Sequence, residues 1–279
     1  MSPERPVSRR MFLGASAAAV GAGLIRPVSA QSSTGATRPA ALRDVKALVF
    51  DTFGTVVDWR TSVAGEVDAV AKRKGLAVDG LAFADAWRAQ YNPSMERVRR
   101  GELPWTTLDR LHRMSLDALL PQYKLTGLAE AEKVALAKAW HRLRPWPDSA
   151  GGLTRLKTQF IIAPLSNGNI ALMTNLAKFA GLPWDCILGA ELARHFKPDP
   201  EVYRSAADFL DLRRDEVMMV AAHLGDLHAA KVEGLRTAFV VRADEYGHGP
   251  NSRKPDLVPN DAYDITAKDF NDLASQLGV

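Results

Sequence analysis

The sequence has few cysteines and, beyond its first thirty residues, almost no net charge. Its one cysteine, Cys186, cannot form a disulfide within the chain, and its apolar surroundings in "WDCILGA" favour a buried, inert thiol over a nucleophile. Residues 1–30 hold four arginines and one glutamate, which leaves 32 basic and 31 acidic side chains in the rest. No basic face for nucleic acid is therefore expected, and the cluster Arg97, Arg99 and Arg100 is predicted to be a solvated helix face.

The first thirty residues have the pattern of an export signal. Arg9 and Arg10 precede an apolar run rich in Ala and Gly, and the small residues "VSA" end at Ala30. The run is too short and too rich in glycine for a stable membrane span. The pattern predicts a twin-arginine signal peptide over residues 1–30, a periplasmic protein, and the twin-arginine translocase as its partner during export. A retained anchor or a disordered tail is the alternative. Residues 31–43 are small and polar and are predicted to be a flexible lead-in.

From residue 44 onward, short apolar runs alternate with longer segments of helical periodicity. The runs typical of buried strands are residues 45–50, 160–166, 185–190, 216–222 and 236–242. The helical segments between them include residues 169–181, 200–211 and 226–234. Strands that alternate with helices predict an α/β fold, with a Rossmann-like parallel sheet covered by helices on both faces.

One interval breaks this alternation. Residues 62–145 contain several helical patterns and no convincing strand, and "RPWPDSAGG" marks the return to the alternating pattern. We therefore expect a core domain formed by residues 44–61 and 146–279, with an inserted all-helical cap domain over residues 62–145. A helical insertion of this kind typically forms a lid over a ligand site.

Polar side chains follow four of the predicted strands. The carboxyl ends of parallel strands meet at one edge of a sheet, which is where ligands bind in such folds. The residues at these ends are Asp51 and Thr55 after the first strand, Ser166 and Asn167 after the second, Lys197 after the third, and His223 and Asp226 after the fourth.

These motifs, in this order, resemble those of the haloacid dehalogenase superfamily over residues 44–279. Phosphatases of that superfamily carry a second Asp two residues after the first and a further Asp in the last motif, which serve proton transfer and Mg²⁺ binding. This chain has Phe53 and Ala230 at those positions. The segment "FDTFGT" is more similar to the L-2-haloacid dehalogenases, and the residues suit attack on carbon without a metal or organic cofactor.

The resemblance implies a role for each residue of the site. Asp51 would displace halide from C2 of a short 2-haloalkanoic acid and form an ester, which water then hydrolyses. Lys197 would keep Asp51 ionised, Thr55 would orient it, and Tyr203 would support the same network. Ser166 and the backbone near Thr52 and Phe53 would hold the substrate carboxylate.

The same resemblance implies that the helical cap supplies the halide site. Arg88, in "AWRAQY", would hold the departing anion together with Asn167, and a surface salt bridge is the alternative for this arginine. Asp226 would orient or activate the hydrolytic water. The last motif departs from the family in Ala221, His223 and Gly225, and His223 is a second base, a donor to the halide or a supporting residue.

The sequence therefore predicts a hydrolase that removes halide from chloroacetate or L-2-halopropionates. Two alternatives stay open: a metal-dependent phosphatase of the same superfamily, and a non-catalytic periplasmic protein that binds a small carboxylate. Members of the family are often dimers, so a homodimer is compatible with the resemblance, although no interface is identified in the sequence.

Overall fold

The computed structural model describes residues 38–248, 253–258 and 263–279. The predicted signal peptide and residues 31–37 of the predicted lead-in lie outside these ranges. Residues 38–43 pack against the core: Leu42, in the short helix η1 (Ala40–Leu42), is buried. The guanidinium group of Arg38 lies 4.3 Å from the centre of the Phe160 ring. This end of the predicted flexible lead-in is thus ordered, because Leu42 provides an apolar anchor that the composition of the segment obscured.

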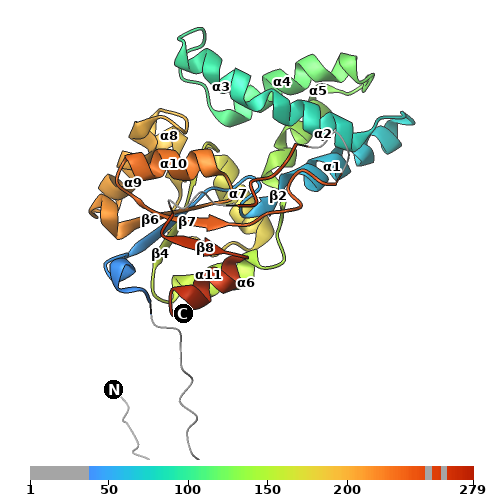
Figure 1. Cartoon of the computed structure of the whole chain (residues 1–279). Helices are drawn as coiled ribbons and strands as arrows, with labels where there is room; N and C mark the ends of the chain where they lie inside the picture. The colour runs from blue at the N-terminus through green and yellow to red at the C-terminus, as the bar shows by residue number, and fades with distance from the viewer. Residues whose placement is uncertain (1–37, 249–252, 259–262) are drawn as a thin grey trace, which may run out of the picture. The chain divides into compact units, whose positions relative to one another are not determined.

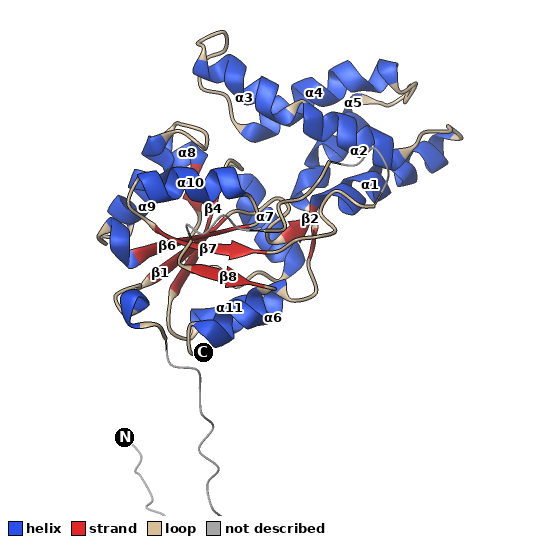
Figure 2. Ribbon diagram, in the orientation of Figure 1, coloured by secondary structure: helices blue, strands red, loops and turns tan. Residues whose placement is uncertain are grey.

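A six-stranded parallel sheet forms the centre of the core (Figures 1 and 2). The strand order is β5 (Leu188–Gly189), β4 (Ile161–Ser166), β1 (Ala47–Phe50), β6 (Val217–Ala221), β7 (Arg236–Val240) and β8 (Ile265–Ala267). The predicted α/β fold with a parallel sheet is confirmed. The edge strand β8 has only three residues, too few for a recognisable apolar run, and was not predicted.

Helices cover both faces of this sheet, as its apolar strands require. One face packs against α6 (Ser149–Lys157), α7 (Ile170–Ala180) and α11 (Phe270–Gln276), and the other against α9 (Pro200–Phe209) and α10 (Leu224–Val232). Alternate residues of β1 serve the two faces: Leu48 and Phe50 point to the first, and Ala47 and Val49 to the second. The short helices α8 (Ala190–Ala193) and η3 (Arg214–Glu216) lie in connections.

The interval predicted to be helical contains six helical segments, which we call the cap (Figure 1). They are α1 (Trp59–Lys74), α2 (Gly80–Ala89), α3 (Tyr91–Arg99), α4 (Leu108–Gln122), α5 (Glu130–Ala137) and η2 (Lys138–His141). Asp58 accepts a hydrogen bond from the Thr61 N–H and so caps α1, and Gly75, at φ 68°, ends this helix. The cap is joined to the core through a short antiparallel pair, β2 (Val57–Asp58) and β3 (Arg144–Pro145), which the sequence did not predict.

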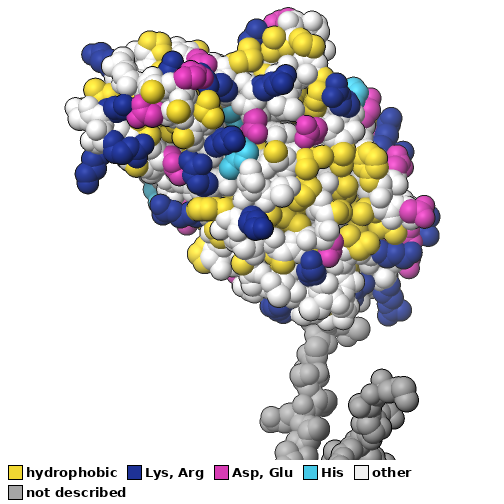
Figure 3. All heavy atoms as spheres, turned by 180° about the vertical axis from the view of Figure 1, so that it is seen from behind, with side chains coloured by type: hydrophobic (Ala, Val, Ile, Leu, Met, Phe, Trp, Pro, Cys, Tyr) yellow, Lys and Arg dark blue, Asp and Glu magenta, His cyan; other side chains and the backbone are white. Residues whose placement is uncertain are grey.

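The surface agrees with the even charge balance of the sequence. On the face shown in Figure 3, basic and acidic side chains are interspersed, and neither sign gathers into a large patch. Within residues 38–248, 253–258 and 263–279, none of the helices has the length and apolar character needed to cross a bilayer.

Candidate active site

Asp51 lies at the centre of the carboxyl edge of the sheet, directly after β1, between β4 and β6. Its backbone N–H donates to the Val220 carbonyl at 3.0 Å, which continues the strand pairing up to the carboxylate. The side chain is buried, and both of its oxygens are bound. Lys197 Nζ lies 3.0 Å from Oδ1, and the Thr55 hydroxyl donates to Oδ2 at 2.8 Å. His223 Nδ1 lies 3.0 Å from the same Oδ2.

These contacts keep Asp51 ionised. Burial alone would raise its pKa, but Lys197, His223 and Thr55 outweigh burial and hold the pKa well below its usual value. A buried carboxylate that stays charged at the carboxyl edge of a parallel sheet is a candidate nucleophile. The Thr55 oxygen also accepts a hydrogen bond from the Ala222 N–H at 2.9 Å, so its hydroxyl hydrogen is directed toward Asp51.

Lys197 bridges Asp51 and Asp226. Its Nζ lies 2.5 Å from Asp226 Oδ2, and the Tyr203 hydroxyl donates to Asp226 Oδ1 at 2.6 Å. Burial would lower the pKa of Lys197, but the two carboxylates raise it, so the ammonium group stays charged. Both oxygens of Asp226 are therefore occupied by donors. This arrangement makes Asp226 an orienting partner of Lys197 more readily than a free base for water.

His223 forms the second positive group beside Asp51. Its Nε2 lies 3.0 Å from Oε2 of Glu245, whose Oε1 accepts a hydrogen bond from Trp59 Nε1 at 3.2 Å. Burial opposes the charge on His223, but Glu245 and Asp51 raise its pKa to about 10. The pKa of Glu245 is lowered below its usual value, because His223 outweighs the effect of burial. At neutral pH the imidazolium therefore lies between two carboxylates.

The sharp turn after Asp51 leaves room for the ion pair of Glu245 and His223. Gly54 has φ 91°, and a Cβ atom on it would come within 2.2 Å of the Glu245 Oε1 atom. Only glycine satisfies both the backbone conformation and the close approach of this carboxylate. Gly54 in the first motif is thus needed for Glu245 to reach His223.

Polar residues at the ends of β4 and β1 fix the loops around the site by hydrogen bonds. The Asn167 side chain accepts a hydrogen bond from the Lys197 N–H at 2.7 Å, which fixes the loop that carries the lysine. The Ser166 oxygen accepts from the Gly168 N–H at 3.1 Å, and the Thr52 hydroxyl donates to the Met173 sulfur at 3.6 Å. The structure thus brings Ser166, Asn167 and Thr52 to the predicted edge, with Ser166 in the turn-capping role that is compatible with catalysis.

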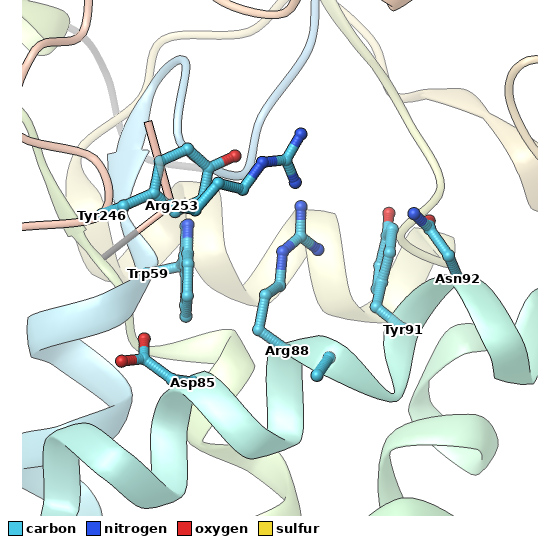
Figure 4. Close-up of a pocket in the computed structure, with 8 residues that line it drawn as sticks. Trp59, Asp85, Arg88, Tyr91, Asn92, Tyr246 and Arg253 are labelled. Atoms are coloured by element: carbon cyan, nitrogen blue, oxygen red, sulfur yellow. The ribbon is translucent and has the colours of Figure 1, made fainter. Parts of the chain in front are cut away.

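Arg88 reaches from the cap into a pocket of about 360 Å³ (Figure 4). Its guanidinium carbon lies 4.0 Å from the centre of the Tyr91 ring and 5.8 Å from that of Phe53. In the part of the chain that the structure describes, its buried Nη1 has no hydrogen-bond partner. The alternative of a surface salt bridge is therefore wrong among these residues, because the cation packs on aromatic faces and leaves donors free for an anion.

Two of the remaining side chains bear on the chemistry. Phe53 is buried and contacts Tyr91 edge to face, with ring centres 6.2 Å apart, so it supplies an apolar wall where a phosphatase has a carboxylate. Burial raises the pKa of the Cys186 thiol, which fits an inert cysteine. Across the described ranges, no group of three or more His, Cys, Asp and Glu side chains is arranged to hold a metal ion.

Sequence reasoning missed Glu245, Trp59 and Tyr91. Glu245 follows β7 by five residues in a loop, and Trp59 begins the cap, so neither stands at a predicted strand end. Tyr91 begins α3, two residues after α2 ends at Ala89. For Tyr91, its spacing of three residues from Arg88 was the available signal. Nothing in the sequence distinguished Glu245 from other loop glutamates.

Comparison with known proteins agrees with this site. Residues 45–234 match the haloacid dehalogenase-like hydrolase family. The chain is 30% identical over 213 residues to (S)-2-haloacid dehalogenase 1 of Pseudomonas sp. (strain CBS-3), which covers 74% of this chain and 90% of that protein.

Two solved structures are more similar still. The defluorinating L-2-haloacid dehalogenase Rha0230 is 48% identical, with a TM-score of 0.82 over 87% of this chain and 99% of that chain. The L-2-haloacid dehalogenase PA0810 is 47% identical, with a TM-score of 0.77 over 84% of this chain and 99% of that chain. The chain thus belongs to the haloacid dehalogenase-like hydrolase family and is a relative of its (S)-2-haloacid dehalogenases.

Proposed function

We propose that this protein hydrolyses short (S)-2-haloalkanoic acids to 2-hydroxy acids through an ester on Asp51. The observation that carries the proposal is the buried, ionised Asp51 held between Lys197 and His223. The charges of both Asp51 and Arg88 act on Tyr91, and Arg88 lines the neighbouring pocket with a donor that is unpaired within the described chain. Such a site offers a nucleophile for carbon and a cationic place for the halide. The similarity to enzymes named for this activity supports the same choice.

In the first half-reaction, an Asp51 oxygen attacks C2 of the substrate. The C–O bond forms as the carbon–halogen bond breaks, and the electron pair of that bond leaves with the halide. Arg88 stabilises the growing negative charge, and its packing on Tyr91 and Phe53 keeps this interaction away from water. The halide needs no proton, which accounts for Phe53 at the position of a phosphatase acid.

In the second half-reaction, water attacks the carbonyl carbon of the Asp51 ester. Once Asp51 is an ester it carries no charge, and one of the two carboxylates that raise the pKa of His223 is lost. His223 can then release its Nδ1 proton and take one from the attacking water, while Nε2 stays hydrogen bonded to Glu245. When the ester C–O bond breaks, the leaving alkoxide takes the proton of the hydroxyl group that water added, which gives the Asp51 carboxylate and the hydroxy acid. The one proton released overall is the one that His223 gave up first.

The phosphatase alternative lacks its acidic residues here. Phe53 and Ala230 are both buried and carry no oxygen, so neither can protonate a leaving alkoxide or ligate Mg²⁺. A non-catalytic carboxylate-binding protein would not need a buried, ionised nucleophile, because Asp51 adds no attraction for an anionic ligand. Assays of chloride release, aryl phosphate hydrolysis and carboxylate binding distinguish both alternatives from the dehalogenase.

The wild-type protein is expected to release chloride from L-2-chloropropionate and from chloroacetate in the presence of a chelator, and at least about tenfold more slowly from the D-isomer. Chloride release is the measurement, and the product is identified as the 2-hydroxy acid of inverted configuration. Magnesium-dependent hydrolysis of an aryl phosphate without chloride release would establish the phosphatase instead. Binding of a carboxylate without turnover would establish the binding protein. Fluoroacetate tests whether the range of halogens resembles that of Rha0230.

Glu245→Gln is expected to lower the pKa of His223 from about 10, because Glu245 is a main cause of the shift. A raised pKa in the folded state gives stability that is complete below about pH 6.5 and is lost as the pH rises through about 10. The fall in melting temperature between pH 7 and pH 10 should therefore be larger in the wild type than in the variant, by at least about 3 °C. Equal pH dependence in the two proteins would contradict the pairing.

A matched control for this variant is Asp244→Asn. Asp244 is the neighbouring residue, is exposed, and pairs only with the exposed His248 among the described residues. Asp244→Asn should leave the pH dependence of the melting temperature unchanged, since an exposed ion pair contributes little to the free energy of unfolding.

We further propose that residues 1–30 direct the folded protein through the twin-arginine translocase to the periplasm, and that the protein forms a homodimer. The paired Arg9 and Arg10 and the "VSA" sequence support export. Fractionation of cells with N-terminal sequencing tests export, and an intact Met1 in the mature protein would contradict cleavage. Light scattering of the purified protein tests the homodimer.

A further inference from the structure

One arginine of the predicted solvated cluster is not solvated. Arg97 and Arg100 in and after α3 are exposed, and their ion pairs with Glu96 and Glu102 lie at the surface. The Arg99 side chain is only 22% exposed; its Nη1 lies 3.4 Å from Glu96 Oε2, and its Nε and Nη2 face the core. The prediction of a solvated face is therefore wrong for Arg99, because adjacent helical residues differ by about 100° in direction.

Arg99 binds the loop that carries Lys197. Its Nε donates to Asp199 Oδ1 at 2.8 Å, and its Nη2 donates to the carbonyl oxygens of Phe196 and Lys197 at 3.1 and 2.6 Å. A single side chain of the cap thus donates hydrogen bonds to three acceptors of one loop. The planar fork of a guanidinium group suits such a set, whereas a lysine ammonium group cannot match its geometry.

The main chain of Lys197 is consequently held from two sides. Its N–H donates to Asn167 Oδ1 of the core at 2.7 Å, and its carbonyl oxygen accepts from Arg99 of the cap. The preceding Phe196 stacks on Trp105 of the segment between α3 and α4, with ring centres 4.8 Å apart. A second contact from the cap therefore supports the same loop.

We propose that Arg99 is a positioning residue that places the Lys197 ammonium group on Asp51 and Asp226 only while the cap is seated on the core. The proposal rests on the proposed function, in which Lys197 keeps the nucleophile ionised. Arg88, which would receive the halide, belongs to the same cap. One movement of the cap therefore brings the halide site over the substrate and fixes the lysine beneath it.

Loss of the Arg99 contacts has a specific electrostatic consequence. The titratable groups around Asp51 are Lys197, His223, Asp226, Tyr91 and Tyr203. Of these, Lys197 is the one whose main chain Arg99 binds. A displaced ammonium group would let the pKa of Asp51 rise toward its usual value. The acid limb of the pH–rate profile would then move to higher pH, an effect that a general loss of stability does not produce.

The test compares Arg99→Ala and Arg99→Lys with the control Arg100→Ala, an exposed arginine one residue away. For Arg99→Ala, we expect kcat for chloride release to fall about 10- to 100-fold with KM changed less than about threefold, and the acid limb to shift upward. Arg99→Lys should lie between this variant and the wild type, and Arg100→Ala should stay within about twofold of the wild type. Guanidinium ion, added far below denaturing concentrations, should restore part of the rate of Arg99→Ala.

A measurement without substrate separates this proposal from the proposed function. The ¹³C resonance of the Asp51 carboxyl carbon, assigned by its loss in Asp51→Asn, should titrate at higher pH in folded Arg99→Lys than in the wild type. If the wild type releases no halide, the proposed function fails, and this titration still decides the role of Arg99. An unchanged Asp51 titration in a folded Arg99 variant would overturn the proposal.

Discussion

Asp51→Asn is expected to lower halide release at least about 10³-fold while the protein stays folded. An amide of the same shape fits between Lys197 and His223, but it carries no charge and cannot displace halide from carbon. The loss should be the same for chloroacetate and L-2-chloropropionate, because the missing group forms the new bond in both reactions. Halide release is measured in the presence of a chelator, and circular dichroism shows that the fold is retained.

A matched control for this substitution is Asp85→Asn, since Asp85 lines the Arg88 pocket. Asp85 pairs with Arg60 through bonds of 2.7 Å, but its side chain is 46% exposed, and in the described structure it does not contact Asp51. Its rate should stay within about threefold of the wild type. If Asp51→Asn kept a tenth of the wild-type rate, attack by Asp51 would be refuted.

The residues predicted from strand ends converge in the structure for a topological reason. Asp51, Lys197 and the pair His223 and Asp226 lie in three segments far apart in sequence, yet the parallel strands bring their own carboxyl ends together at one edge. Apolar runs and strand order therefore suffice to predict most of the polar network. The same reasoning gives the helical cap, whose periodicity is distinct from that of the strands.

The residues that were not predicted, Glu245 and Arg99, contact segments that are distant from them in sequence. Glu245 approaches His223 from a loop after β7, and its place depends on the room left by Gly54, which no local pattern reveals. Arg99 lies in a charged cluster whose members look equivalent in sequence, and only the packing of α3 over the Lys197 loop separates them. The contact of Glu245 with His223 and the contacts of Arg99 with the Lys197 loop thus depend on tertiary structure alone.

His223→Asn is expected to separate the two half-reactions. The amide can still donate a hydrogen bond to Asp51, so displacement of halide should continue at a reduced rate. It cannot accept a proton from water, so hydrolysis of the ester should fall about 10²- to 10⁴-fold. Mixing enzyme with excess L-2-chloropropionate should therefore release one equivalent of chloride per enzyme in a burst and then almost none. Mass spectrometry of the intact protein should show one added carboxyethyl group, located on Asp51.

If Asp226 rather than His223 is the base for the hydrolytic water, the same experiment should give a different result. If Asp226 activates water, His223→Asn slows the first step, no ester accumulates, and chloride release shows no burst. Asp226→Asn would then accumulate the ester instead. The geometry favours His223, because both oxygens of Asp226 already accept hydrogen bonds from Lys197 and Tyr203. His223 Nδ1, in contrast, faces the carboxylate whose charge disappears when the ester forms, and that loss of charge prepares the imidazole to accept a proton when the ester must be hydrolysed.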